Sequence, residues 1–189
     1  MTSEELIASI KGSDEKKRGE AWQQAGEVGS AAVKPLAALV VGTELEVGRA
    51  AKRAIWQIVR HAGRPGADSE RQSVVTELLA VLDEDRPPLL RREVMWMLSE
   101  LAGDEAVPAL ANRLTDPELR EDARMTLQRI PGQASLAALK AALAGAPADF
   151  RPNLAQSLRQ RGVEVAGVPC MKLVPVKKTR VQRPASRPA

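Results

Sequence analysis

Apolar residues between positions 116 and 132 fall on one face of a predicted helix. They follow one another at spacings of four, four and three residues, which is the period of an α-helix, and they are Leu119, Ala123, Leu127 and Ile130. Asp116 is a suitable N-cap, Pro117 suits the first helical position, and Pro131-Gly132 cannot continue the helix. Because isolated helices of this length are marginal in water, we expect a neighbour to cover this stripe.

The same stripe recurs along the chain. Its copies begin near residues 18, 48, 91, 120 and 151, so the step is about 30 residues except once. Most copies start with an arginine and continue with apolar residues at helical spacing: Arg18, Ala21, Ala25 and Val28; Ala51, Ile55 and Ile58, with Gly48 in place of the arginine; Arg91, Val94, Leu98 and Leu101; and Arg151, Leu154 and Leu158. A second, more apolar helix precedes most copies, at 31–42, 105–114 and 134–145.

This repetition predicts an all-α protein, specifically a right-handed α-solenoid (superhelix) of about five stacked antiparallel helical hairpins. The predicted hairpins cover roughly 3–29, 30–62, 68–102, 104–130 and 133–162. The Gly/Pro-rich segment 60–69 accounts for the one long step and is predicted to be a loop. We expect the solenoid to occupy residues 1–164, and residues 165–189 to form a basic, Pro-rich C-terminal tail that is mostly extended or disordered.

The recurrent arginines Arg18, Arg91, Arg120 and Arg151 admit two interpretations. They could form a ladder that binds anions. Alternatively, their stems cover apolar surface at the edge of the stripe while each guanidinium reaches a carboxylate or carbonyl of a neighbouring loop. We favour the second interpretation.

Composition agrees with a helical, aliphatic core. Hydrophobic residues make up 44% of the 189 positions, with one Phe and no Tyr, and alternating apolar and polar stretches typical of strands are missing. The single cysteine, Cys170, excludes an internal disulfide framework and favours a reducing compartment. The N-terminal segment does not read as a secretory signal, and no stretch is apolar enough to span a membrane. A cytoplasmic location is therefore predicted.

The net charge of +4 comes from the tail. Six of the 28 basic residues follow the last acidic residue, Glu164, which leaves 22 basic against 24 acidic residues and a net charge of −2 for residues 1–164. The tail offers candidate anion-binding residues, because lysine and arginine side chains bind phosphate groups whatever the sequence of the nucleic acid that carries them. They are Lys172, Lys177, Lys178, Arg180 and Arg183. A basic tail that only aids solubility is the alternative.

The segments AVPALANRLTDPELREDARMTLQRI (106–130), AAVKPLAAL (31–39) and RREVMWMLSELAG (91–103) resemble the HEAT-repeat family, specifically the short HEAT-like repeats first described in phycobilisome lyases. The resemblance covers about residues 3 to 162. It implies a solenoid in which the second helix of each hairpin lines the concave side, and it implies a scaffold or binding surface more than a particular chemistry.

Residues on the solvent side of the second helices are the candidate partner-binding residues. Counting from Ala123 and its counterparts at 100° per residue, positions two before, two after and five after lie opposite the core. The candidates on this predicted concave face are Arg49, Arg53, Trp56, Arg92, Trp96, Met125, Gln128 and Arg159. Tryptophan and arginine are enriched at binding hot spots. The alternative is that each indole lies over a neighbouring helix with its arginine stacked on it.

The residues expected of common catalytic or metal sites are missing from the sequence. His61, the single histidine, has no Cys or His partner at metal-ligand spacing, and no GxSxG, Walker-type or GxGxxG motif occurs. We therefore expect no cofactor, no metal and no enzymatic activity.

Three functions follow, in order of preference. The first is a non-enzymatic scaffold or adaptor that binds a protein on the concave face. The second is nucleic-acid binding through the tryptophan and arginine residues and the tail, as in DNA glycosylases built from HEAT-like repeats, although residues 1–164 are net negative and offer no matching acidic catalytic residue. The third, a phycobilin lyase or its chaperone, rests on the repeat alone.

Overall fold

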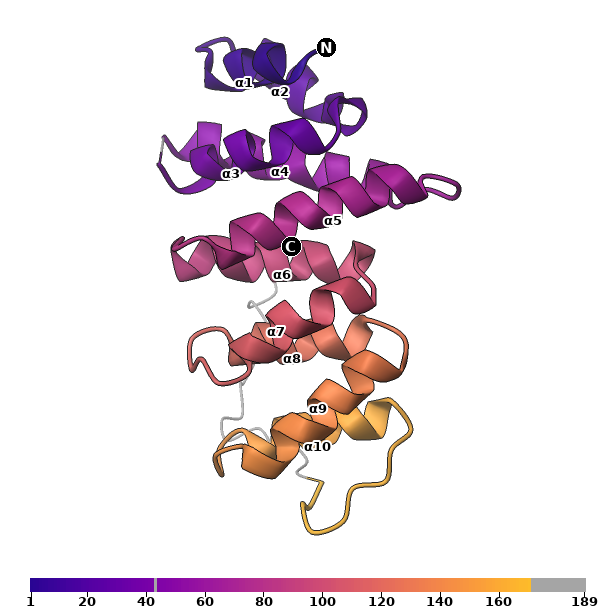
Figure 1. The fold of residues 1–189 in the computed structure, drawn as a ribbon. Coiled ribbons are helices and arrows are strands. Elements are labelled where there is room, and N and C mark those ends of the chain that lie inside the picture. The colour runs from indigo at the N-terminus through magenta and orange to yellow at the C-terminus, as the bar shows by residue number, and fades with distance from the viewer. Residues whose placement is uncertain (43, 171–189) are drawn as a thin grey trace, which may run out of the picture.

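The computed structural model describes residues 1–42 and 44–170, and over these residues the chain contains helices and no strands. The ten α-helices are α1 (Ser3–Lys11), α2 (Glu15–Gln23), α3 (Val33–Gly42), α4 (Leu45–Ala62), α5 (Asp68–Asp83), α6 (Pro88–Leu101), α7 (Val107–Arg113), α8 (Arg120–Arg129), α9 (Gln133–Gly145) and α10 (Arg151–Gln160). Short 3-10 turns precede α3 and α7. The helices pair as the five predicted hairpins, which follow one another along the long axis of the molecule (Figure 1). The predicted α-solenoid is confirmed.

The even-numbered helices form one layer of the stack. In this layer α4 packs on α2 and α6, while α8 packs on α6 and α10. Each odd-numbered helix packs against the even-numbered helix of its own hairpin, and α5 also contacts both helices of the preceding hairpin. Every inner hairpin therefore buries apolar surface against both of its neighbours, which is the arrangement that the repeated stripe requires.

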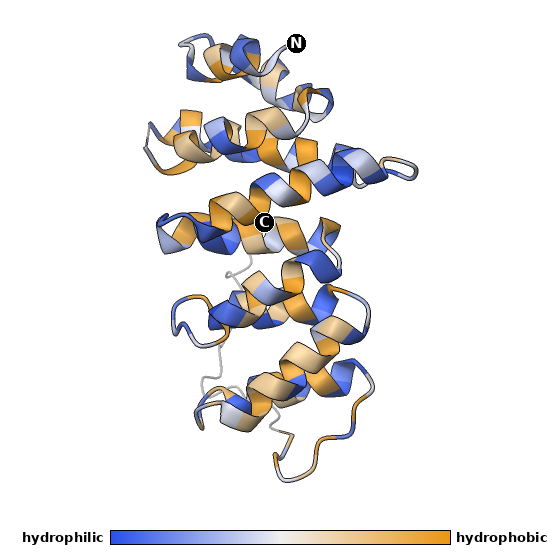
Figure 2. Cartoon of the chain, in the orientation of Figure 1, coloured by the Kyte–Doolittle hydropathy of each residue, from blue (hydrophilic) through white to orange (hydrophobic). Residues whose placement is uncertain are grey.

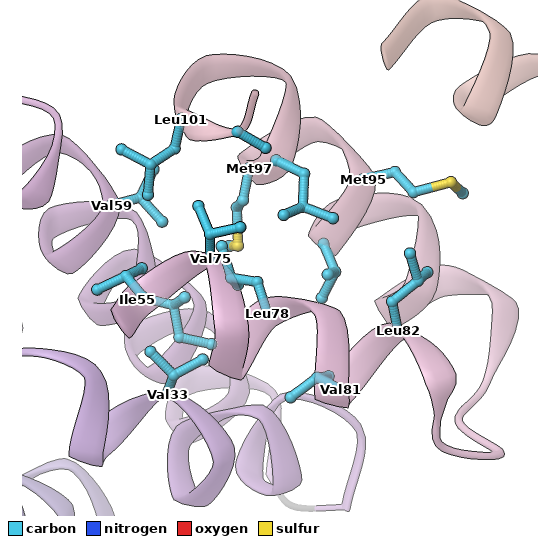
Figure 3. Packing of buried hydrophobic residues seen from close by; sticks show 14 of the residues in the cluster. Val33, Ile55, Val59, Val75, Leu78, Val81, Leu82, Met95, Met97 and Leu101 are labelled. Atoms are coloured by element: carbon cyan, nitrogen blue, oxygen red, sulfur yellow. The ribbon is translucent and has the colours of Figure 1, made fainter. Parts of the chain in front are cut away.

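The core runs continuously through the stack. It extends from Leu6 in α1 to Leu158 in α10 and is built almost wholly from aliphatic side chains. Hydrophobic and hydrophilic positions alternate around the helices, as a stripe on each helix predicts (Figure 2). Figure 3 shows the middle of this core, where Leu78 of α5 lies among side chains of α4 and α6.

The predicted loop at 60–69 is shorter than expected. Helix α4 continues to Ala62 and α5 begins at Asp68, so His61 is a helical residue. The physical reason is that the apolar stripe of α4 does not stop at Ile58 but includes Val59 and Ala62, both of which are buried. Burial of this last turn outweighs the weak helix preference of the sequence around it.

The start of α8 also differs from the prediction. The prediction that Asp116 is the N-cap is wrong: its side chain accepts from the amide of Glu118 at 2.9 Å within a tight turn over residues 117–119, and the helix begins at Arg120 with Leu119 as its N-cap. The amide of Leu119 bonds to the Asp116 carbonyl at 3.1 Å, three residues back, which closes a tighter ring than that of an α-helix.

Arginine side chains satisfy the free carbonyl groups at several helix C-termini. Arg18 donates to the carbonyl oxygens of Ile10 (3.1 Å) and Gly12 (2.5 Å) at the end of α1. Arg161, which follows α10, donates to four carbonyl groups at and after the end of α8: those of Leu127, Gln128, Ile130 and Gly132. Helix ends leave such carbonyls without intrahelical partners. Arg18 thereby joins the two helices of the first hairpin, and Arg161 joins the last hairpin to the one before it.

Two of the predicted structural arginines behave as we expected. Arg18 reaches carbonyl groups as described, and Arg120 donates to Asp149 at 2.5 Å while its guanidinium lies 4.9 Å from the centre of the Phe150 ring. Arg151 is exposed, and Nε of Arg91 is buried with no hydrogen-bond partner among the described residues.

The space around Gly48 shows how closely α3 and α4 pack. A Cβ at this position would lie 2.9 Å from the Val40 carbonyl oxygen, whereas a Cβ at Gly19 in α2 would meet no atom within 4 Å. We expect Gly48→Ala to lower the free energy of unfolding by about 2 kcal/mol through overpacking, since the backbone must shift. Gly19→Ala should raise it by about 0.5 to 1 kcal/mol, because alanine favours the helix. Urea unfolding followed by circular dichroism measures both, and equal effects would contradict the close packing.

Candidate interaction surface

The solvent side of α2, α4, α6, α8 and α10 forms one surface, called here the even-helix face. All eight predicted partner-binding residues belong to α4, α6, α8 or α10. Arg53 and Arg92 are exposed, Trp96 retains 37% of its accessible area, and Trp56 and Met125 are half-buried. That this face is the concave one stays a prediction.

Two tryptophans join consecutive even-numbered helices by the same contact. Trp56 Nε1 of α4 donates to Glu93 Oε1 of α6 at 2.7 Å, and Trp96 Nε1 of α6 donates to Asp122 Oδ1 of α8 at 3.0 Å. In both cases the donor lies on one helix and a carboxylate on the next helix accepts. The indoles thus bridge hairpins.

The same two carboxylates pair with a basic residue four positions before each tryptophan. Lys52 Nζ lies 3.6 Å from Glu93, and Arg92 Nε lies 3.5 Å from Asp122. The Glu93 and Asp122 side chains retain only 25% and 19% of their exposure, so each carboxylate is enclosed by the groups that bind it. Charged, partly desolvated hydrogen bonds of this kind are stronger than neutral ones.

Polar contacts continue across the last junction, between α8 and α10. Asn153 Nδ2 donates to Glu121, and Arg124 donates to Ser157 at 2.5 Å. Gln128, a predicted site residue, donates to Gln160. We call the polar contacts that connect α4, α6, α8 and α10 the junction ladder.

The junction ladder corrects the register that the sequence suggested for α4. Ala54, and not Ala51, is the counterpart of Val94, because only this register makes Lys52 equivalent to Arg92 and Trp56 equivalent to Trp96. The sequence prediction failed because α4 has 18 residues against 14 in α6, so its apolar spacing fits two registers one turn apart. Arg49 therefore has no counterpart in the ladder, and it pairs with Glu46 of its own helix at 2.7 Å.

Arginine side chains stack on two of the three tryptophans, Trp22 and Trp56. Arg53 lies over the ring of Trp22, 5.4 Å from its centre, and connects α4 to α2. Arg60 lies over Trp56 at 5.5 Å. The expectation that each indole lies over a neighbouring helix is thus supported for Trp56 and Trp96 by their hydrogen bonds, while the stacked arginines are Arg53 and Arg60.

Arg159 holds the segment after α10. Its guanidinium donates to the carbonyl oxygens of Val165 (3.2 Å) and Val168, and Val163 and Val165 pack against the core of the last hairpin. This segment covers part of the open end of the stack. The predicted anion-binding residues Lys172, Lys177, Lys178, Arg180 and Arg183 lie outside the described residues.

An apolar edge adjoins the even-helix face and was not expected from the sequence. Val41, Leu45 and Leu89 retain 36%, 66% and 69% of their exposure and line a hollow of about 290 Å³ together with Lys52 and Glu93. The available signal was the position of Leu45 and Leu89 outside the helical stripes, since a large apolar residue there has no core to enter.

A larger, polar hollow of about 610 Å³ lies where the end of α2 meets the C-terminal half of α4. Its lining includes three glutamines and two basic residues, namely Gln23, Gln24, Gln57, Arg60 and His61. Beyond it, Arg64 donates to Glu70 at 2.8 and 2.5 Å. This bond from Arg64 holds the pKa of Glu70 below its usual value, against a smaller opposing effect of burial.

The described residues contain no group of three or more His, Cys, Asp or Glu side chains that could hold a metal ion. Within residues 1–42 and 44–170, no helix has both the length and the apolar character needed to cross a membrane. The exposed side chains of the even-helix face and its apolar edge include Arg53, Arg92, Trp96, Leu45 and Leu89.

The fold and this face define a helical-repeat protein of the α-solenoid class. Residues 75–159, from α5 to α10, match the family model of HEAT repeats, which supports a HEAT-repeat protein. No curated protein matches the chain. Among solved structures, the chain is similar to the crystal structure of an engineered protein, with 21% identity over 84% of this chain and 78% of that chain and a TM-score of 0.42.

The Trp96–Asp122 contact can be tested by a double-mutant cycle. Trp96→Phe keeps the ring but removes the N–H, and Asp122→Ala removes the acceptor. We expect each change to destabilise the protein and the two to couple by about 1 kcal/mol, since they delete one charge-assisted hydrogen bond. Urea unfolding of the four chains measures the coupling. The pair Trp96→Phe and Glu46→Ala, which share no contact, should be additive; comparable coupling in both cycles would refute a direct bond.

Proposed function

We propose that this protein is a non-enzymatic scaffold or adaptor that binds a protein partner on the even-helix face. The observation that supports this most is the junction ladder. It fixes α4, α6, α8 and α10 relative to one another, so that groups on consecutive helices are held in place before a partner arrives. Preorganisation of this kind reduces the entropic cost of association.

The residues offered by the face fit a protein partner. Trp96 is 37% exposed, and Leu45 and Leu89 form the apolar edge in the same layer of helices. Exposed tryptophan, arginine and leucine side chains next to a hollow are typical of interfaces between proteins, in which a few anchors supply most of the affinity.

Nucleic-acid binding by base stacking is less well supported. The rings of Trp22 and Trp56 are covered by arginines, and the N–H groups of Trp56 and Trp96 are engaged by carboxylates. Residues 1–164 are also net negative. The narrower resemblance to the phycobilisome lyase type, with a lyase or chaperone role, remains a proposal that rests on the repeat alone.

The test uses partner capture followed by measured binding. The full chain captures partners from an extract of the source organism, and calorimetry then gives the dissociation constant of the purified partner for each variant. Leu45→Ser with Leu89→Ser should raise this constant at least about tenfold, because it removes two apolar anchors whose exposure makes them dispensable for folding.

The matched control is Gln72→Ser with Lys140→Ser, two exposed changes on the odd-numbered helices α5 and α9. This variant should bind within about twofold of the unchanged chain. Unchanged affinity in the leucine variant, or an equal loss in the control, would exclude the apolar edge of the even-helix face as the partner-binding surface.

A further inference from the structure

Two exposed arginines of the even-helix face are not neutralised. No ion pair within residues 1–42 and 44–170 includes Arg53 or Arg60. Other arginines of this face do have acidic partners: Arg49 pairs with Glu46, Arg92 with Asp122 and Arg124 with Glu121. Arg129 of α8 and Arg151 of α10 also have no ion pair among the described residues, but Arg53 and Arg60 lie on the same helix, α4.

Both guanidinium groups are held in position by tryptophan rings. Arg53 stacks on Trp22 and Arg60 on Trp56, at 5.4 and 5.5 Å from the ring centres. Stacking uses the flat face of a guanidinium and leaves the N–H groups at its edge free to bind a carboxylate or phosphate in a forked geometry. The two residues are seven positions apart on one helix, which places them about 10 Å apart along its axis.

The surroundings add hydrogen-bond donors. Gln57 lies one turn after Arg53 and lines the 610 Å³ hollow with Arg60, together with Gln23 and Gln24. Glu27 is the one carboxylate among the described residues that line this hollow. The negative charge of Glu27 also acts on Arg64. The pKa of Arg64 is raised chiefly by its hydrogen bond to Glu70 and to a lesser degree by the charge of Glu27.

We infer that the junction of α2 and α4, around Arg53 and Arg60, is an anion subsite that binds a short segment rich in Asp or Glu from the protein partner. This inference rests on the proposed function and specifies the chemistry of the partner. An extended segment of about four residues covers the span between the two guanidinium groups.

An acidic peptide fits this site better than a nucleic-acid strand. The arginines cover the rings of Trp22 and Trp56, so bases have no free indole face there. Further along the face, Glu93, Asp122 and Glu121 belong to the junction ladder, and an extended phosphate backbone would pass over these carboxylates. A short anionic segment confined to α2 and α4 avoids them.

The experiment measures binding of a fluorescein-labelled hexaglutamate peptide to the full chain by fluorescence anisotropy. Arg53→Gln with Arg60→Gln should weaken binding about tenfold or more. Arg129→Gln with Arg151→Gln is the matched control, because it removes two exposed arginines that also have no ion pair among the described residues. The control should weaken binding less than about twofold. Arg53→Lys with Arg60→Lys should retain an intermediate affinity, since charge remains without the forked geometry. Because the basic tail is the same in all chains, the difference between the two glutamine variants reports only the substituted arginines.

Three results would overturn the inference. They are an equal loss of affinity in both glutamine variants, no loss in either, and tighter binding of a single-stranded DNA oligonucleotide of equal charge through the same two arginines. These results are distinct from failure of the proposed function. If the captured partner needs Leu45 and Leu89 but the peptide does not need Arg53 and Arg60, only the anion subsite is wrong. If the reverse holds, the anion subsite stands and the apolar edge at Leu45 and Leu89 is not part of the partner-binding surface.

Discussion

Burial of each hairpin's apolar stripe by the next hairpin is the constraint on which the rest of the structure depends. A pair of helices such as α7 and α8, of seven and ten residues, is too short to be stable alone in water. Stacking makes the core continuous from Leu6 to Leu158, so the helices exist because their neighbours do. The stability of such an array is a sum of contacts between adjacent repeats, and its surfaces are accordingly extended and regular.

Polar contacts fix the register between neighbouring helices, which apolar burial alone does not determine. Aliphatic stripes can slide past one another by a turn at little cost, whereas a carboxylate that must receive both an indole N–H and a cation can be satisfied in only one register. Glu93 and Asp122 have this role at successive junctions. Arginines contribute at the helix ends, where Arg161 donates to the carbonyl groups at the end of α8. The same contacts that set the register also hold the even-helix face rigid, which is the property a binding scaffold requires.

The arginines of this protein therefore divide by environment and not by sequence position. Arg92 and Arg120 are neutralised by neighbouring carboxylates, and Arg18 and Arg161 cap helices. Arg53 and Arg60 retain exposed charge beside a polar hollow, and this is why the proposed partner segment is acidic. The apolar edge at Leu45 and Leu89 adds anchors of a different chemistry in the same layer.

The sequence by itself determined the helices and their pairing into five hairpins, because these follow from local periodicity and from its repetition. It could not determine the register of α4, since its apolar residues fit Ala51 or Ala54 equally well, nor the fate of Arg91, Arg120 and Arg151, which occupy the same repeat position in different surroundings. The indole contacts of Trp56 and Trp96, the capping by Arg161 and the apolar edge were decided only by tertiary structure. Each depends on which residues of a neighbouring hairpin lie within hydrogen-bond or van der Waals distance. The amino-acid sequence does not give these distances, because the residues concerned are far apart along the chain.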